Sequence, residues 1–487
     1  MVFNDLKFFI PELFFIGSFC LLLTVFVFSV NSSIKGLSYR SIWDMGFVLT
    51  VLALGLYLCL LFNQVSYFYV LFYGSVDSDF LVVISKVTVV ISVLILLPFA
   101  FSYFKSESFY QYEFFLLLLL SLFGLIILFS SSNFLVMYLG LELQSLAAYV
   151  LVSIRRNSVL SIEAGLRYFV LGSLASGLVL FGIALLYGLT GSIFFSDFYL
   201  LLYGLSVSTD IPFGVQVSSI FILSGLLFKL SAAPFHFWVP DVYEGASTPV
   251  AAFIAVVPKV AIVSLLVRFQ NFFFFVLADH WFSLLLLVSM VSLFVGMLGG
   301  LYQSKIRRLL AYSTITHVGF ITLAFAINAD FAAIYYVVIY AIVNIALFGL
   351  LMILRRVWGN EEFTNIHQLS PLSHSSPLLA YAFVVFFFSL AGLPPFAGFF
   401  AKYYVVLQAV GSDYYLISFL AIFISTVGAF YYLRVVRILF FESSLRWIHL
   451  QPIPTYNRLI LAFFLFINVF FYFFASYLFK LVKICTL

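Results

Sequence analysis

Long apolar stretches alternate with short polar connections along the whole chain. Each stretch lasts about 20 residues, which is the length of an α-helix that crosses a bilayer and about twice that of a membrane barrel strand. We therefore predict about fourteen transmembrane helices and no sizeable extramembrane domain. Their expected ranges are 8–30, 42–63, 80–103, 114–131, 133–153, 162–189, 216–239, 249–268, 281–301, 309–328, 331–355, 377–408, 414–440 and 457–480.

The composition agrees with this pattern and excludes other classes. Of 487 residues, 65% are hydrophobic and only 9% are charged, whereas soluble proteins carry about 25% charged residues. Too few charges are present to cover a soluble fold, which excludes a water-soluble enzyme, a nucleic-acid binder and a disordered chain. The net charge of +4 points to no polyanionic partner. The fold class that remains is an all-α, polytopic membrane protein.

Two of the predicted spans are interrupted by proline. Span 7 contains KLSAAPFHFWVP and span 12 contains LAGLPPFAG. Proline removes a backbone donor, and inside a bilayer the freed groups need partners from protein or water. The two breaks lie five spans apart, which predicts two inverted five-helix repeats, 114–268 and 281–440, with an ion path at the broken helices. Two unrelated proline kinks would produce the same local pattern.

In this division a three-helix segment, residues 1–105, precedes the repeats, and a C-terminal helix within 441–487 follows them.

Four charged residues are predicted at mid-span: Glu142, Lys229, Lys259 and Lys402. Each costs about 2.5–3.5 kcal/mol on membrane-insertion scales, so a functional reason is expected. A desolvated lysine can exchange its proton near neutral pH, and a nearby carboxylate reverses that effect. Movement of Glu142 toward or away from Lys229 would therefore switch this lysine between holding and releasing a proton. Buried structural ion pairs or snorkelling side chains are the alternative interpretation.

Three further residues are weaker candidates. Arg167 and Lys86 lie nearer the ends of their spans, where snorkelling is an alternative, and an arginine stays protonated, so Arg167 could set the local field but not relay protons. His317, in AYSTITHVGF, could relay protons or simply pack as a hydrogen-bonded histidine.

Motifs for cofactors are missing from the sequence. There is no GxGxxG after a strand, no P-loop, no histidine pair placed for haem, and the three cysteines are isolated. We therefore expect no NAD, flavin, ATP, iron–sulfur or metal site in this chain, and we expect the reaction that drives ion movement to take place elsewhere.

Five stretches occur in the order typical of one family: LFSSSNFLVMYLGLELQSLAAYVL, SIEAGLRYFVLGSLASGLVLFG, GLLFKLSAAPFHFWVPDVYEGASTPVAAFIAVVPKVA, IRRLLAYSTITHVGF and FFSLAGLPPFAGFFAKYYVV. Over roughly residues 110–440 the chain resembles the antiporter-like subunits of respiratory complex I. The resemblance implies a fourteen-helix fold with two inverted repeats, and a proton-translocating role in the membrane arm of NADH:ubiquinone reductase. It also implies partners: the other hydrophobic membrane-arm subunits, lipids and protons, with no nucleic acid.

The resemblance also assigns roles to the charged residues of the spans. It implies that they form a proton relay, with Glu142 as the fifth-helix glutamate, Lys229 as its seventh-helix partner, Lys259 as the central lysine, His317 as a relay and Lys402 as the exit-side residue. Arg167 departs from the family pattern, which often has lysine there, and this puts a titrating role for that position in doubt.

Two other functions and two locations stay open. A subunit of a multi-subunit cation/proton antiporter would share these motifs, and a structural spacer that has lost pumping is a further possibility, against which the four intact mid-span charges argue. The 65 phenylalanines either reflect a T-rich organelle genome, which favours the mitochondrial inner membrane, or are ordinary lipid-facing aromatic residues; a bacterial plasma membrane is the alternative location.

The orientation of the chain follows from its basic residues. The loops after predicted spans 1, 3, 5, 9, 11 and 13 carry most lysines and arginines, while loops on the other side carry mainly aspartates. By the positive-inside rule the basic loops face the matrix or cytoplasm and both termini face the other side. Cysteines introduced at positions 413 and 356 should therefore react with an impermeant thiol reagent from opposite sides of the membrane. Labelling of both from one side would show that the span count is wrong.

Overall fold

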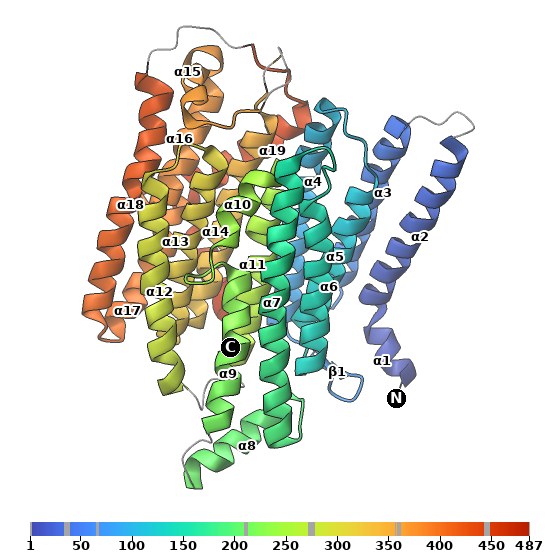
Figure 1. Ribbon diagram of the computed structural model, residues 1–487, viewed down its shortest axis with the longest axis vertical. Coiled ribbons are helices and arrows are strands. Elements are labelled where there is room, and N and C mark those ends of the chain that lie inside the picture. Colours follow the sequence, from blue (N-terminus) through green and yellow to red (C-terminus); the bar gives the residue numbers. More distant parts are fainter. Residues whose placement is uncertain are drawn as a thin grey trace. The chain divides into compact units, whose positions relative to one another are not determined.

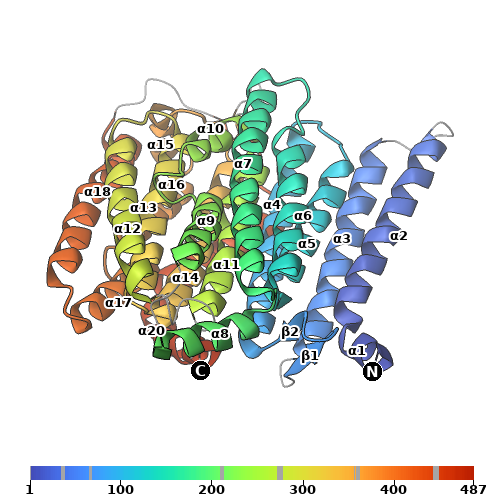
Figure 2. The ribbon, with the colours of Figure 1, turned by 60° about the horizontal axis from the view of Figure 1, so that its bottom comes forward.

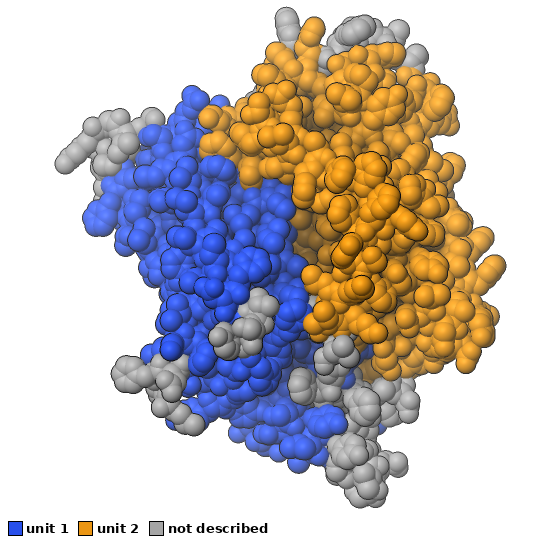
Figure 3. Space-filling view, turned by 180° about the vertical axis from the view of Figure 1, so that it is seen from behind, with its two compact units in different colours: residues 1–97, 108–229, 264–278 blue, residues 98–107, 230–263, 279–487 orange. Residues whose placement is uncertain are grey.

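The computed structural model describes residues 2–33, 39–64, 68–208, 213–270, 278–355, 357, 362–442 and 449–486, so position 356 lies outside the described residues. Packing divides the chain into two compact units (Figure 3), which we describe separately. The first comprises residues 1–97, 108–229 and 264–278, and the second comprises residues 98–107, 230–263 and 279–487. Two long helices, α4 and α11, contribute residues to both units.

The first unit is a set of helices with one short β-hairpin (Figure 1). Its elements are α1 (Val2–Phe8), α2 (Ile10–Ser33), α3 (Tyr39–Phe62), β1 (Tyr69–Leu71), β2 (Val76–Ser78), most of α4 (Phe80–Ser106), α5 (Glu113–Ser130), α6 (Phe134–Val152), α7 (Val159–Thr190), α8 (Phe195–Ser208) and α9 (Phe213–Leu230). Helix α2 packs along α3, and α5 packs along α6 (Figure 2). Helices α5 and α6 approach closely because Gly124 and Gly140 each face backbone atoms of the other helix, where a methyl group would not fit.

The second unit surrounds the buried helix α14. Its elements are α10 (Trp238–Gly245), most of α11 (Thr248–Phe269), α12 (Ala278–Leu301), α13 (Ile306–Ala326), α14 (Asp330–Ile353), the 3₁₀ helix η2 (Ile366–Leu369), α15 (Leu372–Ser375), α16 (Pro377–Ala391), α17 (Ala397–Gly411), α18 (Tyr415–Phe441), α19 (Thr455–Val469) and α20 (Phe471–Thr486). Helix α14 packs against α13, α16, α17, α19 and α20.

The all-α membrane class predicted from the sequence is confirmed. Among the described residues, twelve helices are long and apolar enough to cross a membrane, and each coincides with one predicted span. The count becomes thirteen when the bent pair α19 and α20 is taken as one span. The remaining predicted span, 377–408, consists of α16 and α17, which have only 15 residues each.

The two predicted helix breaks are present. Helix α9 ends at Leu230 and α10 begins at Trp238, while α16 ends at Ala391 and α17 begins at Ala397. The division into two inverted repeats stays a prediction, because compact units defined by packing do not test an internal symmetry.

Two expectations about connections and the C-terminus are corrected. The C-terminal span, expected as one helix over 457–480, is bent by 84° between α19 and α20. Helix α20 carries Lys480 and Lys483 together with exposed aromatic residues, a composition typical of a helix that lies along a membrane surface. The connection between the predicted spans 162–189 and 216–239 was expected to be short and polar, but it contains the helix α8, which lies crosswise to α7 and α9 (Figures 1 and 2).

In the first unit, one arginine of α11 joins the end of α5 to Asp79, the residue that follows the hairpin. Arg268 donates to the carbonyl oxygens of Phe129 (3.0 Å) and Ser131 (2.7 Å) and to the carboxylate of Asp79 (3.0 Å). The last carbonyl oxygens of a helix have no N–H donor from a following turn, and Arg268 supplies such a donor at the end of α5. Burial raises the pKa of the nearby Asp77 carboxyl, and the charge of Arg268 opposes that rise.

Lys86, for which snorkelling was the alternative, is fully buried in an ion pair. Its Nζ lies 2.7 Å from Oε1 of Glu12, and the two side chains are 2% and 3% exposed. This pair joins α2 to α4 within the first unit. A buried ion pair adds little net stability, but the loss of one partner leaves an uncompensated charge.

We therefore expect Glu12→Gln to destabilise the protein by about 3–5 kcal/mol, and Glu12→Gln combined with Lys86→Met to recover most of that loss. The check is the thermal unfolding midpoint of the purified protein. Glu163→Gln removes an ion pair of the same kind that is half exposed, and should cost no more than about 1 kcal/mol. Equal losses in the single and the double variant would contradict this compensation.

Candidate functional site

In the first unit, Glu142 and Lys229 are placed by well-defined helices. Helix α6 begins after Asn133, whose side chain accepts a hydrogen bond from the backbone N–H of Val136 (2.7 Å), as in a standard N-cap. This fixes the start of the helix on which Glu142 lies half-buried near the middle. Lys229 is the penultimate residue of α9 and is 6% exposed.

Lys229 contacts a tyrosine rather than the predicted glutamate. Its Nζ donates to the hydroxyl of Tyr149 at 3.2 Å and lies 5.5 Å from the centre of that ring. Within the described residues, no ion pair within 4.0 Å joins Lys229 to Glu142, although the charge of Glu142 acts on Lys229 through space. Tyr149 follows Glu142 by seven residues, which is two helical turns, so both project from the same face of α6.

Helix α7 holds Tyr149 in this position. The Tyr149 ring makes edge contacts with Tyr168 (4.7 Å between centroids) and Phe169 (5.7 Å). Gly172 makes room for the Tyr149 hydroxyl, since a methyl group at that position would overlap it. Three residues of α7 therefore fix the hydroxyl that Lys229 contacts.

Arg167 lies elsewhere on α7. Its guanidinium pairs with Glu163 one turn earlier at 2.5 Å, and both side chains are about half exposed. The structure therefore places it on the exposed face of α7.

In the second unit, Lys259 has the same kind of partner as Lys229. It follows Pro258 within α11 and is 1% exposed. Its Nζ donates to the hydroxyl of Tyr340 at 3.4 Å and lies 5.5 Å from the centre of that ring. The Tyr340 hydroxyl in turn donates to the carbonyl of Ala255 at 3.1 Å. This donation turns an oxygen lone pair of Tyr340 toward the ammonium.

His317 lies among tyrosines of the same unit. Its Nδ1 is 2.6 Å from the hydroxyl of Tyr336, and its Nε2 is 3.5 Å from the hydroxyl of Tyr432. The ring of Tyr340, the partner of Lys259, lies 5.6 Å from the imidazole centre. Both ring nitrogens therefore have hydroxyl partners that can donate or accept.

Lys402 contacts the backbone at the break between α16 and α17. Its Nζ donates at 2.8 Å to the carbonyl oxygen of Ala391, the last residue of α16. This carbonyl lacks a helical partner because Gly392 ends the helix in the left-handed conformation with a φ of 84°. Lys402 also lies 5.7 Å from the ring of Phe320, which stacks on Tyr336 at 5.8 Å.

These contacts form one series within the second unit. It passes from Lys259 to Tyr340, His317 and Tyr336, and through Phe320 to Lys402. The structure thus brings Lys259, His317 and Lys402 together, while Lys229 and Glu142 belong to the first unit. Each lysine has an oxygen partner, which is what an ammonium group needs when it is removed from water.

Sequence reasoning missed the tyrosines Tyr149, Tyr336 and Tyr340. A tyrosine in an apolar helix is most simply interpreted as packing, because its ring buries a large apolar area. The one available signal was the seven-residue spacing from Glu142 to Tyr149.

Known proteins are similar to this chain in fold and in sequence. The family model described as "NADH:quinone oxidoreductase/Mrp antiporter, TM" matches residues 131–428. A chain of the respiratory complex I from Thermus thermophilus with bound aureothin superimposes with a TM-score of 0.74 at 30% identity, covering 93% of this chain and 96% of that one. A chain of the Mrp complex from Dietzia sp. DQ12-45-1b gives a TM-score of 0.82 at 20% identity over 100% of this chain and 97% of that one, a likeness of fold alone. The fold and the family match define an antiporter-like membrane subunit.

Curated relatives show which family of antiporter-like subunits the chain belongs to. The NADH-quinone oxidoreductase subunit N of Paramagnetospirillum magneticum is 37% identical over 460 residues, covering 93% of this chain and 91% of the relative. Subunit N 1 of Rhizobium meliloti is 40% identical over 374 residues, covering 76% and 77% of the two chains. The chain belongs to the NADH-quinone oxidoreductase subunit N family.

The tyrosine partner of Lys229 can be tested by removal of one oxygen atom. Tyr149→Phe keeps the ring but removes a hydrogen bond to a charged group, worth about 1.5–3 kcal/mol. We expect proton pumping to fall at least about threefold while the protein still assembles. The measurement is proton uptake by reconstituted vesicles per unit of quinone reduction. Tyr187→Phe, which removes a half-exposed hydroxyl from α7, should leave pumping unchanged, and wild-type pumping by Tyr149→Phe would mean that the hydroxyl only packs.

Proposed function

We propose that this chain is a proton-translocating membrane subunit of NADH:quinone oxidoreductase. The observation that carries the proposal is that two buried lysines, Lys229 and Lys259, each meet a tyrosine hydroxyl and ring in nearly the same geometry. The identity of 37% with subunit N relatives over 93% of the chain supports the assignment to this enzyme.

The chemistry of the site suits proton movement. A lysine in an apolar environment can lose its proton at moderate cost, because the neutral amine needs less solvation than the ammonium. Tyr340 can receive a hydrogen bond from protonated Lys259, and its ring is next to the imidazole of His317. His317 can hold a proton at either ring nitrogen. Lys402 then follows at the break between α16 and α17, where the carbonyl of Ala391 stabilises its charged form.

In this proposal Glu142 controls the protonation of Lys229 from a distance. The charge of Glu142 acts on Lys229 through space, while Tyr149 provides the direct contact. A shift of α6 that brought the carboxylate closer would favour protonated Lys229, and the reverse shift would favour release. Arg167 contributes only through its field, since its pair with Glu163 lies on the exposed face of α7.

The antiporter alternative is less well supported. The Mrp complex chain shares the fold, but at 20% identity it carries no argument about activity. Relatives from the oxidoreductase share 35–40% of residues.

We propose that the chain is a multi-pass membrane protein assembled with the other hydrophobic subunits of the complex, and that the redox cofactors belong to other subunits. The mitochondrial inner membrane is our proposal for its location. It rests on the 65 phenylalanines among 487 residues, since phenylalanine codons are rich in T. The relatives compared above are bacterial, which leaves a bacterial plasma membrane as the alternative.

Lys259 provides the test of the proposed function. Lys259→Met should lower proton pumping and the coupled quinone reductase rate by about tenfold or more, as expected when a positioned proton carrier is lost. Lys259→Arg should do the same, because arginine keeps its proton at all relevant pH values. Both rates are measured on the assembled complex in vesicles, and assembly is checked on native gels. If Lys259→Arg pumps normally, the charge alone suffices and the relay is wrong.

A further inference from the structure

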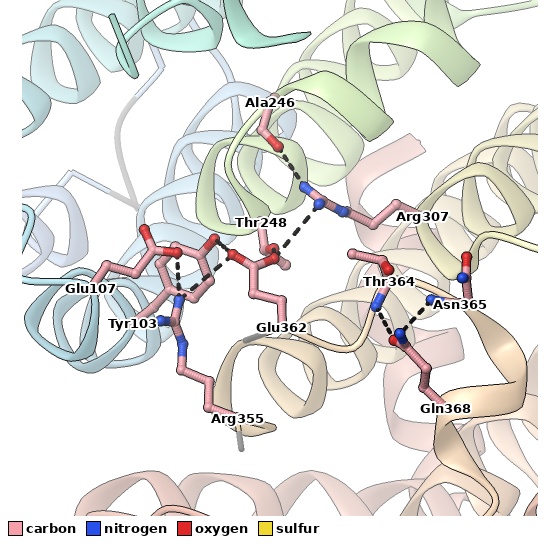
Figure 4. Close-up of polar contacts among 10 residues, drawn as sticks. All are labelled: Tyr103, Glu107, Ala246, Thr248, Arg307, Arg355, Glu362, Thr364, Asn365 and Gln368. Atoms are coloured by element: carbon pink, nitrogen blue, oxygen red, sulfur yellow. Dashed lines mark hydrogen bonds and ion pairs between the residues drawn. The ribbon is translucent and has the colours of Figure 1, made fainter. Parts of the chain in front are cut away.

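Helix α13 is held at its start by a polar network. Arg307, in the first turn, donates to the carbonyl oxygen of Ala246 at 2.7 Å and lies 3.6 Å from Glu362 (Figure 4). Thr248 donates to the same carboxylate at 3.2 Å. About three turns further along α13, His317 lies buried among hydroxyl groups. The network therefore fixes the start of the helix that carries this histidine.

The resting imidazole of His317 is neutral. Within the described part of the chain, no carboxylate lies within 4.0 Å of either ring nitrogen. A protonated ring would therefore be a buried positive charge without a counter-charge, which is costly. A neutral imidazole has one nitrogen that carries a proton and one that accepts a hydrogen bond. The two tyrosine partners decide which nitrogen has which role.

The hydroxyl of Tyr336 is the donor to Nδ1 of His317. The two atoms are 2.6 Å apart, which suits an O–H donor, at about 2.5–3.0 Å, better than an N–H donor, at about 2.7–3.2 Å. Tyr336 is buried, and among the described residues no other acceptor is given for its hydroxyl. If Nδ1 carried the proton, this O–H would be left without a partner, which costs free energy. Nδ1 is therefore the acceptor, and the ring proton is on Nε2.

The Nε2–H of His317 faces Tyr432 of α18. The hydroxyl oxygen of Tyr432 lies 3.5 Å from Nε2, at the upper limit of a hydrogen bond. The hydroxyls of Tyr431 and Ser313 lie beside that of Tyr432. Ser313 gives its own proton to the carbonyl of Leu310 at 2.7 Å, so its oxygen can accept from Tyr432. The ring is thus bonded firmly at Nδ1 and loosely at Nε2, which makes Nε2 the nitrogen that releases a proton.

A hydroxyl partner is also needed beyond His317. The contacts that lead from Tyr336 toward Lys402 include the ring of Phe320. A phenylalanine ring has no exchangeable proton, so these contacts cannot carry one. Tyr432 offers a hydroxyl on the other side of the imidazole.

We infer that Tyr336 holds His317 in the Nε2–H tautomer and that Tyr432 receives the proton that His317 releases. The second part rests on the proposed proton translocation. Uptake adds one proton at Nδ1: Tyr336 passes its own proton to the ring and takes up the translocated one. Release removes one proton from Nε2 to Tyr432, which passes its own proton on toward Ser313. The ring gains one positive charge and loses it again, and each tyrosine ends with one proton.

The tautomer is measured on the assembled complex by infrared spectroscopy, because the ring vibrations of Nε2–H and Nδ1–H histidine differ. Subtraction of the His317→Gln spectrum isolates the signal of His317, and His317→Asn serves if His317→Gln does not assemble. We expect an Nε2–H signal in the wild type and in Tyr432→Phe. Tyr336→Phe should give a mixture of both tautomers, because Nδ1 has lost its donor.

Proton pumping is measured on the same variants in vesicles. Tyr336→Phe and Tyr432→Phe should each lower it about tenfold or more, the effect of losing a positioned proton-transfer group. Tyr335→Phe is the matched control on α14. Tyr335 is buried like Tyr336, but its hydroxyl has no hydrogen-bond partner among the described residues. This variant should change neither the spectrum nor the pumping.

Each part of the inference has an outcome that overturns it. An Nδ1–H signal in the wild type, or an unchanged signal in Tyr336→Phe, would overturn the assigned tautomer or its control by Tyr336. Wild-type pumping by Tyr432→Phe would overturn its role as the acceptor. Normal pumping by His317→Gln would instead contradict the proposed relay, while the infrared signal would still decide the tautomer. The wild-type signal also decides it if Tyr336→Phe does not assemble on native gels.

Discussion

The solvation of lysine inside an apolar helix bundle is the interaction on which the site depends. An ammonium group that has lost water needs oxygen or π-electron partners from the protein. Lys229 and Lys259 obtain both from a single tyrosine each, at matching ring distances of 5.5 Å. Such a partner stabilises the lysine charge without neutralising it. A carboxylate in direct contact would neutralise that charge. This leaves the lysine able to change its protonation state when a charge nearby moves.

A helix break can also provide an oxygen partner for a lysine, in this case from the backbone. Helix breaks inside a bilayer are tolerated only where protein or water satisfies the freed groups. At the end of α16, the carbonyl of Ala391 is one such group, and Lys402 satisfies it. Gly392 makes this possible because its φ of 84° ends the helix at that residue and because a methyl group there would overlap the Lys402 side chain. The end of α16 at Gly392 therefore provides a partner for the charge of Lys402 within an otherwise apolar segment.

Charged residues at the ends of the spans have a structural role. Arg268, Arg307 and Arg355 each bind several acceptors, either carbonyl oxygens at helix ends or carboxylates. Arginine suits these positions since its planar fork can make several hydrogen bonds at once and it keeps its charge. These arginines hold the structure at the ends of the spans, whereas Lys229, Lys259 and Lys402 are the groups that can titrate.

The sequence by itself determined the membrane class, the position of twelve spans, the two proline breaks and the buried lysines Lys229 and Lys259. It could do so because hydrophobic length and proline act locally, within one helix. The partners of those charges were decided by the tertiary structure. The pair of Lys86 with Glu12 joins residues 74 positions apart, and the contact of Lys229 with Tyr149 joins residues 80 apart. The expected direct contact of Glu142 with Lys229 is replaced by Tyr149 because α7 holds that ring in place through Tyr168 and Phe169. Which side chains meet depends on how helices pack, and no periodicity within a single helix contains that information.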